Sequence, residues 1–389
     1  MAALIAAVCS AAYLLLLALK GAGVWISIRE SRQRARRAAP PPADWMQSVC
    51  VLQPILSGDP RLPEVLADTV TALPHVQFLW LVDRNDLVAG RIVSAIRRAH
   101  PSVAIDVQHF DAAPPGVNPK LYKLAPALDT VARPIAVVLD DDARLSPRSL
   151  QQMVTELDDA DLVTALPFYR DHGRDLGAGV LAQFVNNNSA LTYLSLLPVM
   201  APVSINGMCY AARTVQVSGA DSLAPVVRCL ADDLAVAQLF RGRGRRIVQS
   251  TAPVALETST PTFGRYWRQM HRWFVFAWLL LRDQGRAVQL LIVILHAAPP
   301  ALLLVMLVAT VLAGSPLPWV LTGIVVLLRA FVVIGIQRAL TARHRHRVVL
   351  SLVSELLQPL HLMHALLDRT ITWRTRTYHV RANRDFSAV

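Results

Sequence analysis

Three consecutive aspartates, Asp140, Asp141 and Asp142, directly follow an apolar and mostly β-branched segment, residues 135–139. Such a segment is typical of a strand that is buried on both faces of a parallel sheet. Because side chains alternate along an extended backbone, Asp140 and Asp142 should point to one side and Asp141 to the other. Neighbouring carboxylates repel one another unless a hard cation lies between them. The segment therefore indicates either an Asp-x-Asp metal site or a solvated acidic turn.

Further acids stand where two other predicted elements begin or end. Asp83 directly follows a second apolar segment, residues 76–82, and Asp232 and Asp233 open a predicted helix. The carboxyl ends of parallel strands meet at one edge of a sheet, where open α/β sheets bind their ligands. Asp83 is therefore expected at the same edge as Asp140. Two acids in a first helical turn also suit the helix macrodipole, so a purely structural role is the alternative for that pair.

The elements that would position these acids alternate between strand-like and helix-like segments. Apolar stretches of strand length are followed by amphipathic stretches of helix length, which predicts right-handed βαβ units and an α/β fold with a mainly parallel sheet. The expected strands are residues 48–55, 76–82, 103–110, 135–139 and 162–166, and the expected helices are residues 62–73, 87–99, 119–131, 147–157, 176–197 and 231–240.

The composition places much of the remaining chain at a membrane. Of the 389 residues, 54% are hydrophobic and only 17% are charged, which is too apolar for an ordinary soluble protein. The net charge is +12, and the basic residues crowd beside apolar segments, as expected at a membrane surface. The sequence has no zinc-finger spacing or aromatic RNA-binding motif, so we expect no nucleic-acid partner. Its 4 scattered cysteines predict neither disulfides nor a zinc site.

Apolar segments long enough to cross a bilayer are residues 2–28, 287–313 and 317–336. A cleaved signal peptide is the alternative for the first, although no positively charged segment precedes it. The arginine-rich residues 29–37 and the basic tail predict cytoplasmic positions. Residues 348–367 are interrupted by polar side chains, so we expect them to lie in the interface or to re-enter the bilayer. A fourth crossing is the alternative.

Two further groups of side chains could act at the membrane. The cationic and aromatic residues 266–281 predict an amphipathic helix at the interface, with tryptophans as anchors. His361 and His364 lie on one helical face and could bind a metal ion. Histidines at this spacing more often satisfy polar groups inside a helical bundle, and we favour that interpretation.

Taken in order, the motifs resemble those of the ceramide glucosyltransferases, membrane-anchored GT-A enzymes of family 21 that are related to glycosyltransferase family 2. The resemblance extends over about residues 49–381. A single Asp-x-Asp is a weak signal, whereas the ordered set between apolar segments is specific. The matching motifs are Leu81-Val-Asp83, Gly116-Val-Asn-Pro-Lys120, Asp140-Asp-Asp142, Asn206-Gly-Met208, Asp232-Asp233 and Gln269-Met-His-Arg-Trp273.

The resemblance implies roles for these positions. Asp83 would contact the uracil of a UDP-sugar, although Asp86 is an alternative first acid. Asp233 would be the general base that deprotonates the acceptor hydroxyl. The residues of the Gln-x-x-Arg-Trp motif would close over the diphosphate and the sugar. The implied catalytic residues are Asp233 and Arg272, the implied substrate-binding residues are Asp83, Lys120, Asp140, Asp232, Gln269 and Trp273, and the implied metal ligands are Asp142 and Asp140.

The implied activity is inverting and metal-dependent, with Mn²⁺ or Mg²⁺ as the cofactor. It would move a hexose, with glucose favoured, from a UDP-sugar to the hydroxyl group of a membrane lipid, with ceramide favoured. Ala190 stands where the animal enzymes carry a histidine, which leaves the acceptor open. The alternatives are another bacterial lipid such as a hopanoid, a polysaccharide synthase, and an inactive lipid-binding scaffold.

We expect five consecutive regions along the chain. They are an N-terminal transmembrane helix, a basic and proline-rich linker, a GT-A domain, an interfacial helix with the Gln-x-x-Arg-Trp motif, and C-terminal membrane helices with a basic tail. The arginine- and alanine-rich composition suggests a GC-rich bacterial genome. We therefore expect an integral protein of a bacterial inner membrane whose catalytic domain faces the cytoplasm. The expected bounds are residues 1–28, 29–47, 48–265, 266–285 and 286–389.

Overall fold

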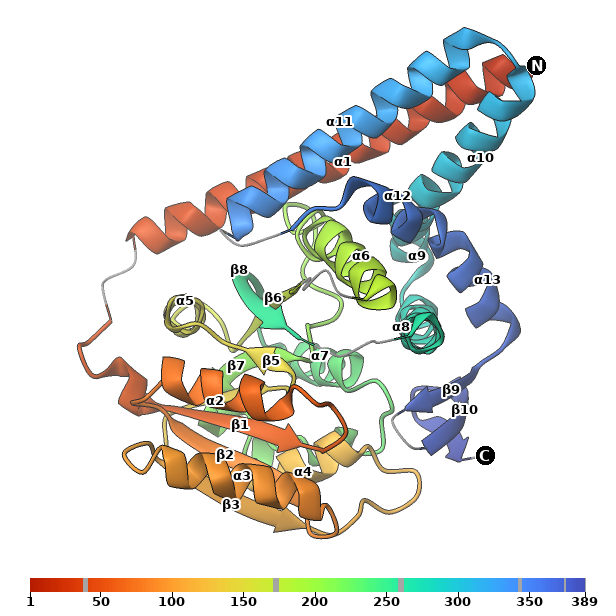
Figure 1. Ribbon diagram of the computed structural model, residues 1–389. Coiled ribbons are helices and arrows are strands. Elements are labelled where there is room, and N and C mark those ends of the chain that lie inside the picture. Colours follow the sequence, from red (N-terminus) through yellow and green to blue (C-terminus); the bar gives the residue numbers. More distant parts are fainter. Residues whose placement is uncertain (38–40, 171–174, 258–261, 342–344, 374–375, 389) are drawn as a thin grey trace. The chain divides into compact units, whose positions relative to one another are not determined.

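The computed structural model describes residues 1–388 apart from 38–40, 171–174, 258–261, 342–344 and 374–375 (Figure 1). The chain forms two compact units, and each is described by itself. The helical unit comprises Met1–Glu30, Arg170–Met200 and Thr260–Thr375, and the sheet unit comprises Ser31–Tyr169, Ala201–Ser259 and Arg376–Val389.

The strands of the central sheet are β1 Val49–Ile55, β2 Gln77–Asp83, β3 Ile105–Phe110, β4 Ile135–Leu139, β5 Ala143–Arg144, β6 Leu162–Tyr169, β7 Cys209–Arg213 and β8 Ile247–Leu256. They form one 8-stranded sheet in the order β3-β2-β1-β4-β7-β6-β8-β5. The first four strands in this order pair in parallel, as do β6 and β8. β7 runs antiparallel to both β4 and β6, and β5 runs antiparallel to β8. The predicted α/β fold with a mainly parallel sheet is therefore confirmed.

Helices cover this sheet on both faces. On one face, Leu121 and Leu124 of α4 and Phe240 of α7 pack in one buried cluster with Leu52 of β1. The next residue of β1, Gln53, points to the other face and accepts a hydrogen bond from the Trp80 indole N–H at 2.9 Å. Both faces of β1 are thus buried, as its apolar run predicted. The helices are α2 Leu62–Ala72, α3 Leu87–Ala99, α4 Pro119–Leu128, α5 Pro147–Glu156 and α7 Asp232–Gly242, with short 3₁₀ turns η1 Trp45–Ser48, η2 Thr214–Gln216, η3 Gly219–Asp221 and η4 Ala224–Val226.

The sheet unit also contains a hairpin from the end of the chain. Strands β10 (Arg376–Ala382) and β11 (Asp385–Ala388) pair antiparallel, with a register shift between Val380 and Ala382. The sequence analysis assigned only basic character to this segment. Its residues belong to the sheet unit although they follow the apolar helices in the sequence.

The helical unit contains the long apolar helices. Its elements are the first part of α1 (Ala2–Arg37), α6 Leu176–Tyr193, α8 Phe263–Arg282, α9 Arg286–Ile292, the π-helical turn η5 Val293–Ala297, α10 Ala298–Ala313, α11 Pro316–Leu340, α12 Val348–Leu356, α13 Gln358–Leu367 and the strand β9 Thr370–Trp373. Within the described residues, 4 helical stretches are long and apolar enough to cross a membrane: Ala2–Arg37, Arg286–Ala313, Pro316–Leu340 and Val348–Leu367. The protein is therefore a membrane protein.

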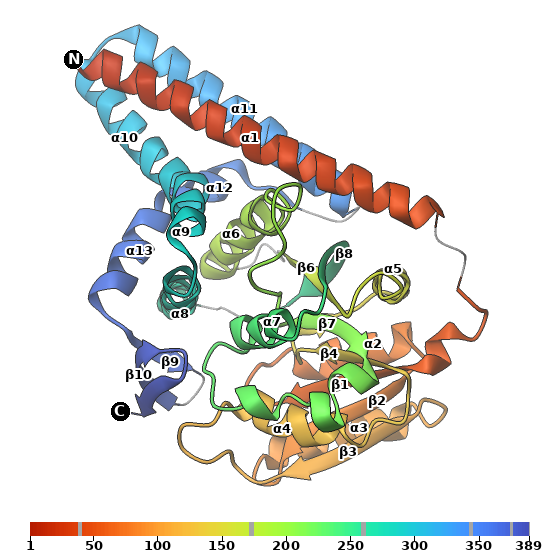
Figure 2. The same ribbon diagram turned by 180° about the vertical axis from the view of Figure 1, so that it is seen from behind.

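Apolar packing and one buried polar network hold these helices together. α1 and α11 run side by side, and α10 diverges from them (Figures 1 and 2). Tyr13 of α1, Leu303 of α10 and Val325 of α11 contribute to one buried cluster. Near this cluster the Tyr13 hydroxyl donates to Glu355 Oε1 at 2.9 Å. Arg329 Nε donates to Glu355 Oε2 at 2.5 Å, and Arg329 Nη1 donates to Ser351 Oγ at 2.8 Å. Polar groups that would be costly in lipid are therefore satisfied by one another.

Three local features differ from the sequence-based expectations. α1 continues through the arginine-rich segment to Arg37, which we had assigned to a linker. The segment Val348–Leu367 consists of two helices, because α12 ends at Leu356 and α13 starts anew with Pro359 in its first turn. Strands β5, β8 and β9 and the hairpin strands β10 and β11 were not predicted. Whether Val348–Leu367 crosses the membrane or lies in the interface stays a prediction.

Candidate active site

The candidate site residues fall into two groups, one in each unit. Gln269, Arg272 and Trp273 belong to the helical unit, and the acids and Lys120 belong to the sheet unit. In the sheet unit β1 pairs in parallel with both β2 and β4, so the acids that end β2 and follow β4 lie at one edge, separated by a single strand. The expected common edge is thus present in the structure.

Lys120 is at the centre of the sheet-unit group. Its ammonium group lies 2.7 Å from Asp140 Oδ1 and 2.9 Å from Asp232 Oδ2, and it donates to the Gly207 carbonyl oxygen at 2.6 Å. Burial acts to lower the pKa of Lys120, but the two carboxylates outweigh burial and raise it, so the side chain stays charged. The Lys120 ammonium group therefore links Asp140, after β4, to Asp232, at the start of α7.

The start of α4 positions this lysine. The Asn118 side chain caps the helix by accepting hydrogen bonds from two backbone N–H groups of the first turn, at 2.9 and 3.2 Å. Pro119 occupies the start of the helix, where its missing N–H is not needed. Lys123 follows Lys120 on the same helical face, and its ammonium group lies 3.1 Å from Asp83 Oδ1. Two lysines of one helix thus pair with acids of two strands.

Asp86, the alternative to Asp83, has a different environment. Its carboxylate accepts hydrogen bonds from the Ala89 N–H at 2.9 Å and from the Ser57 N–H at 2.8 Å, so it caps α3. Burial acts to raise the pKa of Asp86, but these hydrogen bonds outweigh it and lower the pKa overall. The Asp86 side chain thus has a structural role as a helix cap, and the role expected for Asp83 stays a prediction.

The pair Asp232 and Asp233 opens α7 beside a glycine turn. A β-carbon added at Gly207 would lie 3.1 Å from Asp233 Cβ and 3.3 Å from Asp232 Oδ2, so glycine permits this close approach. Burial and, next, the negative charge of Asp232 raise the pKa of Asp233 from its ordinary value of 3.8 to about 7. A carboxylate with this pKa can accept a proton near neutral pH, which a general base requires.

The segment before α7 is held from two sides. The Asn118 amide N–H group donates to the carbonyl oxygens of Cys229 and Leu230, both at 3.0 Å. From the turn between β10 and β11, Asn383 Oδ1 accepts a hydrogen bond from the Ala231 N–H at 2.7 Å, and its carbonyl oxygen accepts from the Leu230 N–H at 2.8 Å. Two asparagines from distant parts of the chain therefore fix the start of α7.

The loop after β4 is fixed through its backbone and through Asp141. The Asp140 N–H and the Asp142 carbonyl oxygen each make one backbone hydrogen bond to another segment, at 2.8 and 2.9 Å. Asp141 is only 7% exposed, and its carboxylate accepts a hydrogen bond from the Leu56 N–H at 2.8 Å. Asp140 and Asp142 are partly exposed. Asp141 thus has a structural role, whereas Asp140 pairs with Lys120 and Asp142 is partly exposed.

Asp140 and Asp142 have the chemistry to hold a hard divalent cation. Carboxylate oxygens suit Mg²⁺ and Mn²⁺, and Mg²⁺ is usually held by one or two carboxylates together with substrate phosphates. Among the described residues, these two aspartates do not belong to a cluster of three or more metal-ligating side chains. Their oxygen donors therefore fit a hard divalent cation such as Mg²⁺ or Mn²⁺.

In the helical unit, the Gln-x-x-Arg-Trp motif lies on α8. Arg272 Nη2 donates a hydrogen bond to Gln269 Oε1 at 2.9 Å, one helical turn earlier. The Trp273 ring stacks on Phe184 of α6, with ring centroids 6.3 Å apart and planes at 29°. The motif thus forms an ordered surface on α8. The roles expected for its three residues stay predictions.

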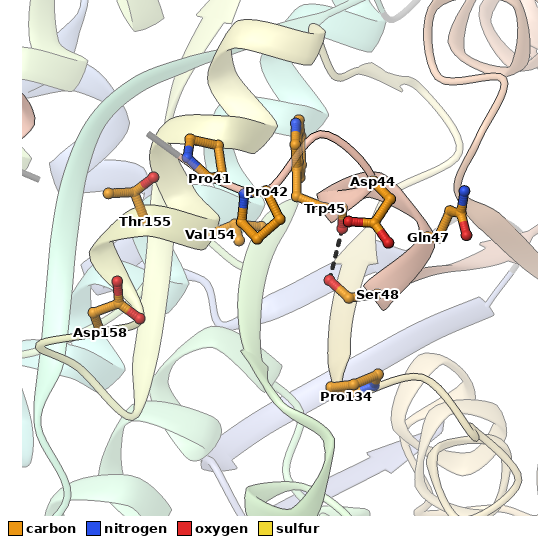
Figure 3. Close-up of a pocket in the computed structure, with 10 residues that line it drawn as sticks. All are labelled: Pro41, Pro42, Asp44, Trp45, Gln47, Ser48, Pro134, Val154, Thr155 and Asp158. Atoms are coloured by element: carbon orange, nitrogen blue, oxygen red, sulfur yellow. Dashed lines mark hydrogen bonds between the residues drawn. The ribbon is translucent and has the colours of Figure 1, made fainter. Parts of the chain in front are cut away.

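A separate pocket of about 510 Å³ lies in the sheet unit (Figure 3), and its lining does not include the candidate acids. Its lining includes Ser48, which precedes β1, and Pro134, which precedes β4, together with Trp45 and Asp158. These residues mark the amino ends of the strands, whereas the acids lie at the carboxyl ends. Open α/β sheets bind ligands at the carboxyl ends, so this pocket is not the candidate active site.

Several residues that support the acids were not predicted from the sequence. Lys123 could have been found from its i, i+3 spacing to Lys120. No local signal pointed to Asn383 or to the buried carboxylate Glu257, whose partners lie far away in the sequence. Glu257 forms ion pairs with Arg144 and Arg61, next to the loop that carries Asp142.

Comparison with solved structures gives the class of the fold. The chain is similar to the mannosyltransferase PcManGT from Pyrobaculum calidifontis, solved in complex with GDP-Man and Mn²⁺. The TM-score is 0.50 with 16% sequence identity, and the similarity covers 92% of this chain and 98% of the other. The mainly parallel sheet with acids at its carboxyl edge is thus a GT-A fold. The sequence profile described as Glycosyl transferase family 21 matches residues 4–386, and the chain belongs to this family.

A curated relative points in the same direction. The chain is 22% identical over 238 residues to Ceramide glucosyltransferase 1 of Caenorhabditis elegans. The matched region covers 60% of this chain and 50% of the relative, so the chain spans about half of the length of that protein. The family resemblance found in the sequence motifs is confirmed by the two comparisons of sequence.

Proposed function

We propose that the protein transfers a hexose, glucose in the first instance, from a UDP-sugar to the hydroxyl group of a membrane lipid, with ceramide as the preferred acceptor. Membership of family 21 and the similarity to a ceramide glucosyltransferase support this choice of donor and acceptor. The apolar helices support a lipid acceptor, because a membrane protein has access to lipids. The reaction inverts the configuration at the sugar carbon and depends on Mn²⁺ or Mg²⁺.

The environment of Asp233 is the observation that carries the proposal. Its carboxylate has a pKa of about 7 and opens α7 next to the lysine-bridged acids. In the reaction, Asp233 accepts the proton of the lipid hydroxyl while the hydroxyl oxygen forms a bond to the sugar carbon. The bond between that carbon and the diphosphate oxygen breaks, and the electron pair leaves with the UDP.

The other site residues bind and orient the donor. When bound at Asp140 and Asp142, a divalent ion supplies positive charge to the departing diphosphate. Lys120 holds Asp140 and Asp232 at fixed positions on either side of the Gly207 turn. We assign Asp83 to the uracil ring.

The motif on α8 completes this assignment. We assign Gln269 and Arg272 to the diphosphate and the sugar, because a guanidinium group can bind phosphate oxygens in pairs. Trp273 would shape the acceptor end. The hydrogen bond between Gln269 and Arg272 supports a fixed orientation of the guanidinium group.

We also propose that the protein lies in a bacterial inner membrane with its catalytic acids on the cytoplasmic side. The arginines at the end of α1 support this orientation, because basic residues next to a membrane span favour the cytoplasm. Labelling of single cysteines introduced near Arg37 and in the turn at Gly314, in intact and permeabilised cells, would test it. Labelling of the Arg37 position in intact cells would contradict the proposal.

Transfer assays on the full-length protein in lipid nanodiscs test the activity. We expect a glycolipid from UDP-glucose, ceramide and Mn²⁺, and Asp233→Asn should lower the rate at least about 100-fold without abolishing UDP binding. Asp158→Asn, at a side chain that is 79% exposed, is the matched control and should retain full activity. The donors should include UDP-galactose and GDP-mannose, and the acceptors a hopanoid.

Each outcome of this assay decides between the candidate functions. Transfer to a hopanoid and not to ceramide would replace the acceptor. A long soluble polymer would indicate a polysaccharide synthase. UDP binding without transfer to any acceptor would indicate a lipid-binding scaffold and would refute the proposal.

A further inference from the structure

A second group of metal-ligating side chains lies in the helical unit. His271 is on α8, His364 is on α13, and Asp368 directly follows α13. One ligand atom from each of these residues lies within 4.8 Å of the other two. Among the described residues, this is the one group of three or more such side chains with this spacing. The acids of the sheet unit are not part of it.

His271 has the arrangement of a metal ligand. Its ring is only 5% exposed, and Nε2 lies 3.2 Å from the carbonyl oxygen of Thr370. A carbonyl oxygen can only accept, so Nε2 carries the proton and Nδ1 presents a lone pair. Nδ1 is buried and has no hydrogen-bond partner among the described residues. An unsatisfied buried acceptor is costly, whereas a histidine that donates its other N–H to a backbone carbonyl is the usual form of a metal-bound imidazole.

The start of β9 orients two of the three ligands. Thr370 accepts the hydrogen bond from His271 through its carbonyl oxygen and donates through its N–H to Asp368 Oδ1 at 2.8 Å. Asp368 is exposed, so an ion and water can reach its carboxylate. Hydrogen bonds from residues that do not themselves bind the ion fix the orientation of the ligand side chains. The backbone of Thr370 therefore orients both the His271 imidazole and the Asp368 carboxylate.

His364 contributes the second imidazole, next to the first. The ring centroids of His271 and His364 are 4.0 Å apart. The Trp267 indole N–H donates to His364 Nδ1 at 3.1 Å, so the neutral His364 ring carries its proton on Nε2. An ion that binds Nδ1 displaces the indole N–H directly. An ion that binds Nε2 requires the ring proton to move to Nδ1, which then can no longer accept the indole hydrogen bond. Trp267 therefore competes with the ion for His364.

We propose that His271, His364 and Asp368 form a binding site for a divalent transition-metal ion of the Zn²⁺ type. Two imidazoles and one carboxylate are borderline donors that suit Zn²⁺ or Co²⁺, whereas the acids near Lys120 offer only oxygen. Three protein ligands leave a fourth position for water or another small ligand. A bound ion would tie α8, on which Gln269 and Arg272 flank His271, to the end of α13.

Titration of the full-length protein with Co²⁺ tests the proposal directly. The protein is purified in detergent, treated with a chelator and titrated with Co²⁺, whose visible absorption reports nitrogen coordination, and Zn²⁺ is then added as a competitor. We expect one Co²⁺ to bind and Zn²⁺ to displace it. His271→Ala and Asp368→Asn should each weaken Co²⁺ binding at least about 10-fold. Loss of a residue that only hydrogen-bonds to a metal ligand already lowers metal affinity by about that factor. His109→Ala, at an exposed histidine of β3, is the matched control.

Two further variants separate this site from the acids of the sheet unit and define the role of the indole. Trp267→Phe keeps an aromatic ring but removes the competing N–H, so it should strengthen Co²⁺ binding. Asp140→Asn/Asp142→Asn should abolish sugar transfer and leave Co²⁺ binding unchanged, so the two sites can fail independently. Absence of Co²⁺ and Zn²⁺ binding, binding that His271→Ala does not weaken, or binding lost in the aspartate double variant would each overturn the proposal. Size-exclusion profiles of the variants show whether they are folded.

Discussion

The two units each bury a basic residue against acids, but the two arrangements have different consequences. In the sheet unit, Lys120 is shared by Asp140 and Asp232, whose side chains are 28% and 16% exposed. In the helical unit, Arg329 pairs with Glu355, and its guanidinium group is further satisfied by Ser351. Arg329 is only 3% exposed. The first group has more acids than bases and faces water, whereas the second is balanced and closed.

This difference separates a reactive cluster from a structural one. In the sheet unit, burial and, next, the negative charge of Asp232 raise the pKa of Asp233. Carboxylates in excess over bases at this sheet edge can also attract a cation. A balanced pair inside apolar helices offers neither a free charge nor an open ligand position. It stabilises the packing because each partner would be costly to bury alone. Position relative to water and charge balance, and not the mere presence of acids, therefore distinguish the candidate active site.

The largest effect is expected from breaking the balanced pair. Arg329→Leu leaves Glu355 buried without its partner, so the free energy of unfolding should fall by about 3–5 kcal/mol. Denaturant unfolding in detergent micelles measures this. The double variant Arg329→Leu/Glu355→Leu should recover most of the loss. Full stability of the single variant would show that the pair is not structural.

Removal of the lysine from the reactive cluster should act on turnover instead. Lys120→Met leaves Asp140 and Asp232 to repel each other, so sugar transfer should fall about 100-fold, or ~2.7 kcal/mol in activation free energy. Stability should change less than in Arg329→Leu, because water can reach these acids. Steady-state kinetics together with thermal unfolding measure both quantities. A Lys120→Met enzyme with full activity would contradict the central role of this lysine.

The pH dependence of transfer should report Asp233. Its pKa of about 7 means that the basic form is lost below neutral pH, so kcat/KM should rise with pH up to about 7 and level off above it. Because the folded pKa lies above the ordinary value of 3.8, the contribution of this group to stability falls as pH rises between these values. Asp232→Asn removes one cause of the shift, so the midpoint of its residual activity should move to lower pH. An unchanged midpoint would assign the titration to another group.

The smallest effect is expected at the asparagine that holds the start of α7. Asn383→Ala removes the acceptor for the buried Ala231 N–H and should lower the free energy of unfolding by about 1 kcal/mol. Asn383→Asp keeps an acceptor at this position and should cost less. Both variants can be compared in the same unfolding and transfer assays. Equal losses for the two would show that the hydrogen bond to Ala231 is not the cause.

Local sequence patterns predicted those strands whose burial can be recognised from consecutive residues. The continuous apolar runs of β1 and β4 identified buried parallel strands, and alternation correctly separated Asp141 from its neighbours. β8 was missed because Gln249, Ser250 and Thr251 interrupt its apolar residues and Pro253 is unfavourable inside a strand. Its position depends on pairing with β6 and β5, which no local pattern encodes.

The candidate site was predictable to a similar degree. The acids could be found because each stands at the end of a strand or the start of a helix, and the ordered motifs joined them to one family. The Lys123 pair with Asp83 needed only the helical spacing and was overlooked. By contrast, 152 residues separate Asn383 from Ala231, and a side chain to backbone contact over that distance leaves no signal in a single sequence.

The Asn383 contact has a consequence for the order in which the enzyme matures. A ribosome makes the chain from its amino end, so Asp233 emerges early and Asn383 emerges only after all four membrane-spanning candidates have been synthesised. Domains generally begin to fold during synthesis. Until the last segment arrives, the Ala231 N–H lacks its partner and the start of α7 is held from one side only. Asp233, the proposed general base, is therefore fixed in place late, when the membrane part of the protein has already left the ribosome.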